Sequence, residues 1–156
     1  MEIIKDLLRN DMIVCAIVAY MLAQLFKIFT TTYREKEFHF SQLWGSGGMP
    51  SSHSSTVCAM TFSCARVYGV ADPVFAICIV LSGVVMYDAT GVRRAAGEHA
   101  KMLNHMIADL FSGNPDYAQK ALKELIGHTP LQVAMGALLG ILIGLFFPSL
   151  SPWIGS

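Results

Sequence analysis

Four stretches of the chain are long and apolar enough to predict buried helices. The first runs from Met12 to about Thr31 and the second from Ser54 to about Val70. The third runs from Pro73 to about Tyr87, and the fourth from Thr129 to Phe147. Because about 20 mostly apolar residues in a helix cross the core of a bilayer, this pattern predicts four transmembrane helices.

Small residues mark two of these stretches as sites of close packing. The second is rich in Ser, Thr, Ala and Cys, and the fourth carries Gly136, Gly140 and Gly144 on one helical face. Small side chains let helices approach closely in lipid. We therefore expect the second helix to lie centrally and the glycine face of the fourth to form a packed interface.

The region between the third and fourth stretches has a different pattern. Apolar residues recur at helical spacing from Lys101 to Phe111, and Ser112-Gly113-Asn114-Pro115 breaks this pattern. A second set of apolar residues at helical spacing follows, and the helix that it predicts ends at Gly127. The members of this set are Tyr117, Ala121, Leu122, Leu125 and Ile126. Both segments are too polar to span, which predicts two short amphipathic helices on the membrane surface or over a site.

Composition supports a membrane protein. The chain has 156 residues, of which 54% are hydrophobic and 14% charged, whereas a soluble domain has about 25% charged residues. The net charge is zero and no basic run is present, which argues against a nucleic-acid partner. The four cysteines lie in apolar segments and are interpreted as small buried side chains. We expect one all-α integral membrane domain over residues 1–156, with its first apolar stretch retained as a helix.

Four polar clusters stand at the ends of the apolar stretches. They are Lys27 with Arg34, the turn Pro50-Ser51-Ser52-His53, Asp88 with Arg93 and Arg94, and His128. The first two flank the loop between the first and second helices, and the others flank the loop between the third and fourth. With four spans, both loops emerge on one side of the membrane, so all four clusters can converge there.

The chemistry of the converging groups favours a phosphoryl site. Cations and the backbone N–H groups of a glycine-rich turn at a helix start bind phosphate. Two histidines can divide the work of nucleophile and general acid. The chain shows no Cys/His ligand cluster, so we expect neither a metal nor a cofactor. Taken singly, each cluster has a structural explanation, such as cations reaching the membrane surface or a histidine capping a helix.

Two of these clusters resemble the motifs of a known superfamily over roughly residues 20 to 145. Lys27 and Arg34 have the spacing of Lys-x6-Arg-Pro, with Glu35 in place of the proline. The turn from Pro50 to His53 is similar to Pro-Ser-Gly-His, with Ser52 in place of glycine. These motifs belong to the type-2 phosphatidic acid phosphatases, a superfamily that includes vanadium haloperoxidases. The chain most resembles its divergent branch, described as acid phosphatase/vanadium-dependent haloperoxidase-related.

The third motif of that superfamily, Ser-Arg-x5-His-x3-Asp, has two possible matches. Arg93 and His99 have its literal spacing. His128, however, is followed by an apolar, glycine-bearing helix, as the motif histidine usually is. We favour a split motif, in which the arginine is Arg93 or Arg94 and the histidine is His128. His99 remains the alternative nucleophile.

The resemblance implies a metal-independent phosphatase that works through a phosphohistidine. His128 would attack phosphorus, and His53 would protonate the leaving oxygen. The groups expected to bind the phosphoryl oxygens are Lys27, Arg34, Arg93 or Arg94, Ser51 and the backbone near Ser52. Gln132 stands where the superfamily has an acid, so it can support the ring of His128 only as a neutral acceptor, unless Asp88 supplies the charge.

The expected substrate is a phosphorylated lipid, either a lipid phosphate or a prenyl pyrophosphate, in a site at the membrane surface. The alternative is a catalytically inactive lipid-phosphate-binding or scaffolding membrane protein. A phosphoalcohol transferase is a third reading, because the segment from Asp88 to Arg93 is similar to the start of that motif, but its downstream Asp-x3-Asp is missing. The sequence leaves open the identity of the lipid and the formation of homo-oligomers.

Positive charges suggest which side the site faces. On the side of the clusters lie Arg34, Lys36, Arg93, Arg94, Lys101, Lys120 and Lys123; on the other lie Lys5 and Arg9, with Arg66 near it. Because cytoplasmic loops of membrane proteins carry an excess of Lys and Arg, this distribution predicts a site on the cytoplasmic side.

Overall fold

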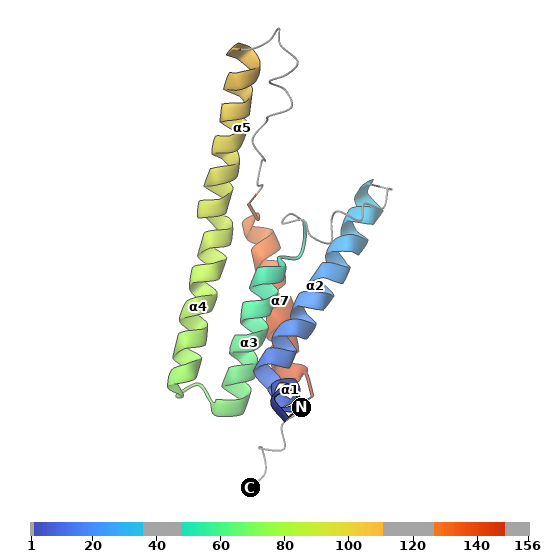
Figure 1. Ribbon diagram of the computed structural model, residues 1–156, viewed down its shortest axis with the longest axis vertical. Coiled ribbons are helices and arrows are strands. Elements are labelled where there is room, and N and C mark those ends of the chain that lie inside the picture. Colours follow the sequence, from blue (N-terminus) through green and yellow to red (C-terminus); the bar gives the residue numbers. More distant parts are fainter. Residues whose placement is uncertain (1, 36–47, 111–126, 149–156) are drawn as a thin grey trace.

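The computed structural model describes residues 2–35, 48–110 and 127–148, which are helical apart from short connections (Figure 1). The helices are α1 (Glu2–Arg9), α2 (Asp11–Glu35), α3 (Ser52–Tyr68), α4 (Pro73–Thr90), α5 (Val92–Leu110) and α7 (Pro130–Phe146). The prediction of an all-α chain is confirmed for these residues. The four predicted apolar helices correspond to α2, α3, α4 and α7.

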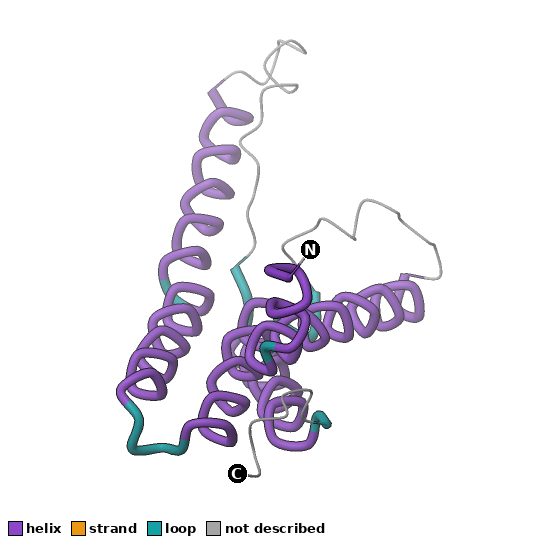
Figure 2. The backbone as a smooth tube through the Cα atoms, turned by 60° about the horizontal axis from the view of Figure 1, so that its bottom comes forward, coloured by secondary structure: helices purple, strands orange, loops and turns teal. Residues whose placement is uncertain are grey.

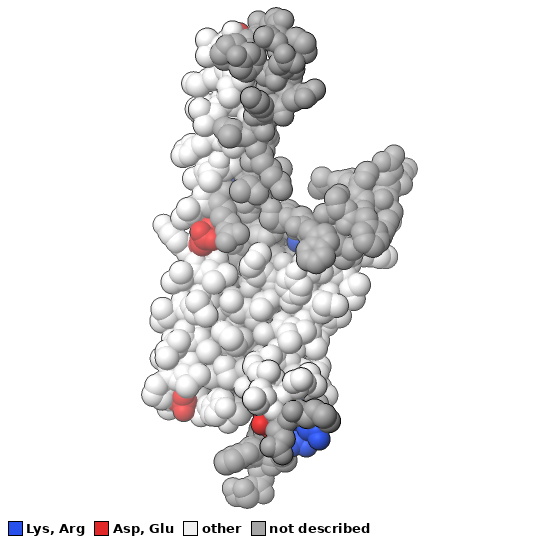
Figure 3. Space-filling view, in the orientation of Figure 1, with Lys and Arg blue, Asp and Glu red and all other residues white. Residues whose placement is uncertain are grey.

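Two helical segments are long and apolar enough to cross a membrane, Asp11–Tyr33 and Pro73–Leu110. Pro130–Phe146 is apolar but shorter. On the face shown in Figure 3, the described Lys, Arg, Asp and Glu side chains lie mainly at the foot and near mid-height of the molecule, and the surface between these two levels is uncharged. These features agree with a membrane protein, and the crossing of all four helices remains a prediction.

Helix α3 lies at the centre of the bundle, as its small residues predicted. It contacts α2, α4 and α7, and its buried residues are Ser, Thr, Cys and Ala. Hydroxyl groups on α3 also join it to its neighbours. The Thr61 Oγ1 lies 2.8 Å from the Ser82 Oγ of α4, and the Ser55 hydroxyl donates to the Ala19 carbonyl of α2 at 3.3 Å. In an apolar setting these bonds satisfy groups that would otherwise be costly to bury.

The glycines of α7 let this helix lie directly against the backbone of α3. A Cβ at Gly136 would lie 2.3 Å from the Ser51 carbonyl oxygen, and one at Gly140 would lie 2.2 Å from the Ser55 carbonyl oxygen. One turn further, a Cβ at Gly144 would lie 2.7 Å from the carbonyl oxygen of Ala59. The predicted packed interface is confirmed, and it positions the start of α7 beside the start of α3.

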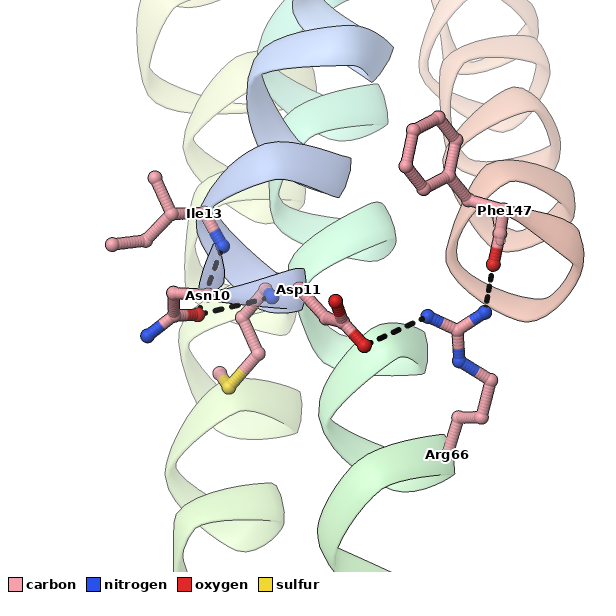
Figure 4. Close-up of polar contacts among 6 residues, drawn as sticks. Asn10, Asp11, Ile13, Arg66 and Phe147 are labelled. Carbon is pink, nitrogen blue, oxygen red and sulfur yellow. Dashed lines mark hydrogen bonds and ion pairs between the residues drawn. The ribbon is translucent and has the colours of Figure 1, made fainter. Parts of the chain in front are cut away.

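A polar cluster closes the opposite end of the bundle (Figure 4). The Arg66 Nη2 of α3 lies 3.6 Å from the Asp11 Oδ2 at the start of α2. The Arg66 Nη1 donates to the Phe147 carbonyl at the end of α7. Since Asp11 is buried, the guanidinium compensates a carboxylate that would be costly alone. One side chain thus ties three helix ends together.

The amphipathic helix after α4 begins earlier than predicted. We expected it to start at Lys101, but α5 starts at Val92, one residue after Gly91 ends the hydrogen bonding of α4. Figures 1 and 2 show α5 continuing nearly along the line of α4. The segment 92–100 contains Ala, Arg and Glu, which are strong helix formers, so the helix extends back to the end of α4. The second predicted amphipathic helix, at 117–126, lies outside the described residues.

The close contact between α3 and α7 predicts that Gly140→Ala destabilises the protein. The added methyl would meet the backbone of Ser55, which cannot rotate away, and overpacking of this kind costs about 1–3 kcal/mol. Gly83→Ala on α4 is the matched control, because nothing lies within 4 Å of its Cβ position. Thermal unfolding in detergent, followed by circular dichroism, should show a lower Tm for Gly140→Ala alone. Equal Tm values for the two variants would contradict this packing.

Candidate functional site

The turn before α3 is held against the end of α2. The Thr30 hydroxyl donates to the Met49 carbonyl at 3.0 Å. Gly48 has a φ of 97°, and a Cβ there would lie 2.8 Å from the Lys27 Cγ. Only glycine therefore suits this position, both for its backbone conformation and for its contact with the lysine stem. Lys27, which is 2% exposed, is thus buried beside the turn.

The same turn is bonded to the start of α7. The Ser51 N–H donates to the Gln132 carbonyl at 3.0 Å, while the Ser51 Oγ caps α3 by accepting from the Ser54 N–H at 3.4 Å. The Met49–Pro50 peptide bond is cis. Ser51 and Ser52 are buried, whereas His53, in the first turn of α3, is exposed. The turn therefore presents an imidazole at the surface above two buried serines.

His128 lies at the junction of α4 and α5. Its backbone N–H donates to the Ala89 carbonyl at 3.2 Å. The preceding Gly127 approaches α5 so closely that a Cβ on it would lie 2.4 Å from the Arg94 backbone nitrogen. His128 and the backbone of Arg94 are thus neighbours in the fold, although they are far apart in sequence. The split motif predicted from the sequence pairs His128 with Arg93 or Arg94. The sequence showed Gly127 only as a helix stop and did not reveal this contact.

The side chain of Gln132 indicates which nitrogen of His128 carries a proton. The Gln132 Oε1 accepts a hydrogen bond from the Thr129 backbone N–H at 3.0 Å; because that group can only donate, the atom facing it must be the oxygen. The same Oε1 lies 3.2 Å from the His128 Nδ1. An amide oxygen only accepts, so Nδ1 is the donor. A neutral His128 therefore has its proton on Nδ1 and its lone pair on Nε2.

The other predicted site residues lie around these contacts. Arg94 is an exposed residue in the first turn of α5, and Asp88 is half-buried in α4, one residue before Ala89. The candidate His99 lies on an exposed face further along α5. Arg34 and Arg93 belong to α2 and α5, but their side chains lie outside the described part of the structure.

The contacts join all four sequence clusters at one end of the bundle, opposite the pair of Asp11 and Arg66. From Lys27 they run through the turn at 48–51 to the start of α7, then to His128, and from there to the junction of α4 and α5. Among the described residues, no group of three or more His, Cys, Asp or Glu could hold a metal ion. A hydroxyl-rich helix start, two imidazoles and at least two cations are groups that bind a phosphoryl ligand.

Comparisons with known proteins point to one family. The profile of the Divergent PAP2 family matches residues 8–143, a range that includes every candidate site residue. The chain is 35% identical over 150 residues to a protein of Bacillus subtilis (strain 168) named "Uncharacterized membrane protein YuiD". The alignment covers 90% of this chain and 95% of the relative. No solved structure matches the chain.

Because the Gln132 Oε1 contacts both the Thr129 N–H and the His128 ring, we expect two substitutions of Gln132 to differ in their effects. Gln132→Leu removes the acceptor of both the Thr129 N–H and the His128 ring, and loss of such a capping interaction costs about 0.5–2 kcal/mol. Gln132→Glu keeps an acceptor there. We expect a lower Tm for the leucine variant and a value close to wild type for the glutamate variant.

Nitrogen NMR of histidine-labelled protein, at a pH where the rings are neutral, tests the proton position directly. The His128 resonances, assigned with His128→Ala, should show a protonated Nδ1 in the wild type. In Gln132→Leu the proton should move toward Nε2, the form that imidazole favours in water. An Nε2-protonated ring in the wild type would refute the assignment.

Proposed function

The chain belongs to the Divergent PAP2 family, and we propose that it is a metal-independent membrane phosphatase that hydrolyses a lipid phosphate or prenyl pyrophosphate. The reaction proceeds through a phosphohistidine intermediate. The observation that carries this proposal is the juxtaposition of His128 with the α4–α5 junction and, through Gln132, with the Ser51 turn. These contacts bring Lys27, the turn at 48–51, His128 and the backbone of Arg94 to one end of the bundle.

The first half of the reaction forms a bond from His128 to phosphorus. The lone pair on Nε2, on the side of the ring away from Gln132, attacks the phosphorus atom, and the bond from phosphorus to the leaving oxygen breaks. His53 donates a proton to that oxygen. General acid help of this kind contributes about 10²–10⁴-fold. His53 is exposed on α3, and this position suits a group that protonates the leaving part of the substrate.

The second half releases inorganic phosphate. Water attacks the phosphohistidine and gives a proton to His53, and the phosphorus–nitrogen bond breaks to restore neutral His128. Lys27, Arg34 and Arg93 or Arg94 neutralise the phosphoryl oxygens, together with Ser51 and the backbone near Ser52. Preorganised charge of this kind is often the largest catalytic contribution. No metal ion or cofactor takes part.

The substrate class follows from the proposed place of the site in the membrane. Helices α2, α3, α4 and α7 cross the bilayer, with the site at the surface where α2 and α4 end. A phosphorylated head group then reaches His128 while its tail stays in lipid. The excess of Lys and Arg on this side supports an orientation in which the site faces the cytoplasm.

We propose that α5, which follows the line of α4 in the structure (Figure 1), bends at Gly91 in the membrane and lies on its surface beside the site. The continuous segment Pro73–Leu110 has 38 residues, well beyond the ~20 that cross a bilayer core. Charges begin directly after α4, with Arg93, Arg94 and Glu98, whereas exposed apolar residues continue along one side of α5; they include Met102, Leu103, Met106 and Leu110. A bend at Gly91 would bring that stripe into the interface.

A second candidate function uses the same site without turnover. Gln132 holds the histidine as a neutral acceptor and supplies no negative charge to stabilise the ring when it becomes cationic. This observation favours a protein that binds lipid phosphates but does not hydrolyse them. Turnover decides between the two candidates.

The test is phosphate release by detergent-purified protein from a panel of lipid phosphates and prenyl pyrophosphates, with a chelator present. We expect release that is inhibited by vanadate, a mimic of the phosphoryl transition state. His128→Ala should lower it to background, and His53→Ala by about 10²–10⁴-fold. His105→Ala, an exposed residue of α5, is the control and should retain activity.

Three other outcomes would change the proposal. Loss of release in His99→Ala, with release retained in His128→Ala, would move the nucleophile to His99. Release that the chelator abolishes would contradict a metal-independent reaction. No release from any substrate, with lipid phosphates still bound, would support the inactive binding protein.

A further inference from the structure

Helix α1 has one apolar face and one charged face. Its apolar residues are Ile3, Ile4, Leu7 and Leu8, and its charged ones include Lys5, Asp6 and Arg9. Residues three and four apart share a helix face, so the two sets lie on opposite sides. The exposed fractions of the four apolar side chains run from 49% for Leu7 to 76% for Ile3. Within the described part of the chain, this face is largely uncovered.

The junction with α2 holds α1 in a defined place. The Asn10 backbone N–H donates to the Leu7 carbonyl at 3.2 Å. The Asn10 Oδ1 accepts from the backbone N–H groups of Met12 at 3.1 Å and Ile13 at 3.2 Å, which caps α2 (Figure 4). Asn10 thus ends one helix and starts the next. Figure 1 shows α1 nearly end-on at the foot of the bundle, whereas α3, α4 and α7 run along the page. Helix α1 therefore lies across the end of the bundle.

We propose that α1 binds the interface of a lipid bilayer, in the leaflet opposite the candidate site. Its apolar side chains enter the boundary between head groups and acyl chains, and its charged face meets water. This inference rests on the membrane location proposed above and not on the phosphatase reaction. The apolar segment Asp11–Tyr33 begins directly after Asn10, so chain connectivity places α1 at the depth where a membrane span starts.

The position and orientation of α1 favour lipid as the occupant of this face, and its charges indicate which lipid is sufficient. Lys5 and Arg9 are balanced by Glu2 and Asp6, so attraction to anionic head groups adds little and apolar burial provides the binding. A helix that lies across the start of a span runs parallel to the membrane plane. Exposed apolar side chains continue from α1 into the first two turns of α2, at Ile13 and Ile17. A zwitterionic bilayer is therefore sufficient.

Tryptophan fluorescence of the full chain in phosphatidylcholine vesicles tests the proposal. Trp44 and Trp153, the two tryptophans of the sequence, are replaced by phenylalanine, and a single probe is added as Leu7→Trp. The matched control is Asp6→Trp on the charged face. We expect Leu7→Trp to emit at shorter wavelength, to be quenched by lipids brominated high on the acyl chain, and to resist aqueous acrylamide. Asp6→Trp should show the opposite behaviour.

Two results would overturn the proposal. Equal acrylamide quenching of the two probes would place the apolar face in water. A Leu7→Trp probe shielded from both acrylamide and brominated lipid would show that protein covers this face, either a second copy or another segment of the chain. If Leu7→Trp does not give a monodisperse protein, Ile4→Trp with Lys5→Trp provides an equivalent pair. None of these readouts needs activity, so failure of the phosphatase test leaves this result interpretable.

Discussion

The close approach of α7 to α3 is the constraint on which the rest of the structure depends. Gly136, Gly140 and Gly144 present no side chains, so successive turns of α7 rest on backbone carbonyls of α3. This contact sets the start of α7 beside the start of α3 closely enough for the Ser51 N–H to bond to the Gln132 carbonyl. Any side chain at these glycines would separate the two helix starts, and with them the serine turn and His128.

The two ends of the bundle use their polar groups differently. At the foot, Arg66 is matched by the carboxylate of Asp11 and the Phe147 carbonyl, which compensates the charge within the protein. At the other end, the described contacts bring Lys27, the serine turn and His128 together near Asp88 of α4. The pair of Asp11 and Arg66 suits a structural role, whereas hydroxyl and N–H groups at a helix start beside a lysine are groups that bind anions.

Gln132 has a central place in the site because one residue serves three contacts. Its side-chain oxygen meets the Thr129 N–H and the His128 ring, and its carbonyl meets Ser51. A carboxylate could make the same two side-chain contacts and would add negative charge. The amide makes these contacts without that charge, so it orients the His128 ring as a neutral acceptor.

The sequence by itself determined the helical class, the four apolar helices, the central place of α3 and the packed glycine face of α7. Each of these follows from local periodicity and residue size, which are readable along one helix. The early start of α5 and the amphipathic pattern of α1 are local as well, since helix-forming residues and helical spacing encode them. The contact of Gln132 with the His128 ring was also expected from their spacing of four residues, and the structure confirms it. Only the tertiary structure decided that Gly48 lies on Lys27 and that Gly127 lies on Arg94. These two contacts join residues that are distant in sequence, and the spacing of residues along the chain does not encode which distant residues meet.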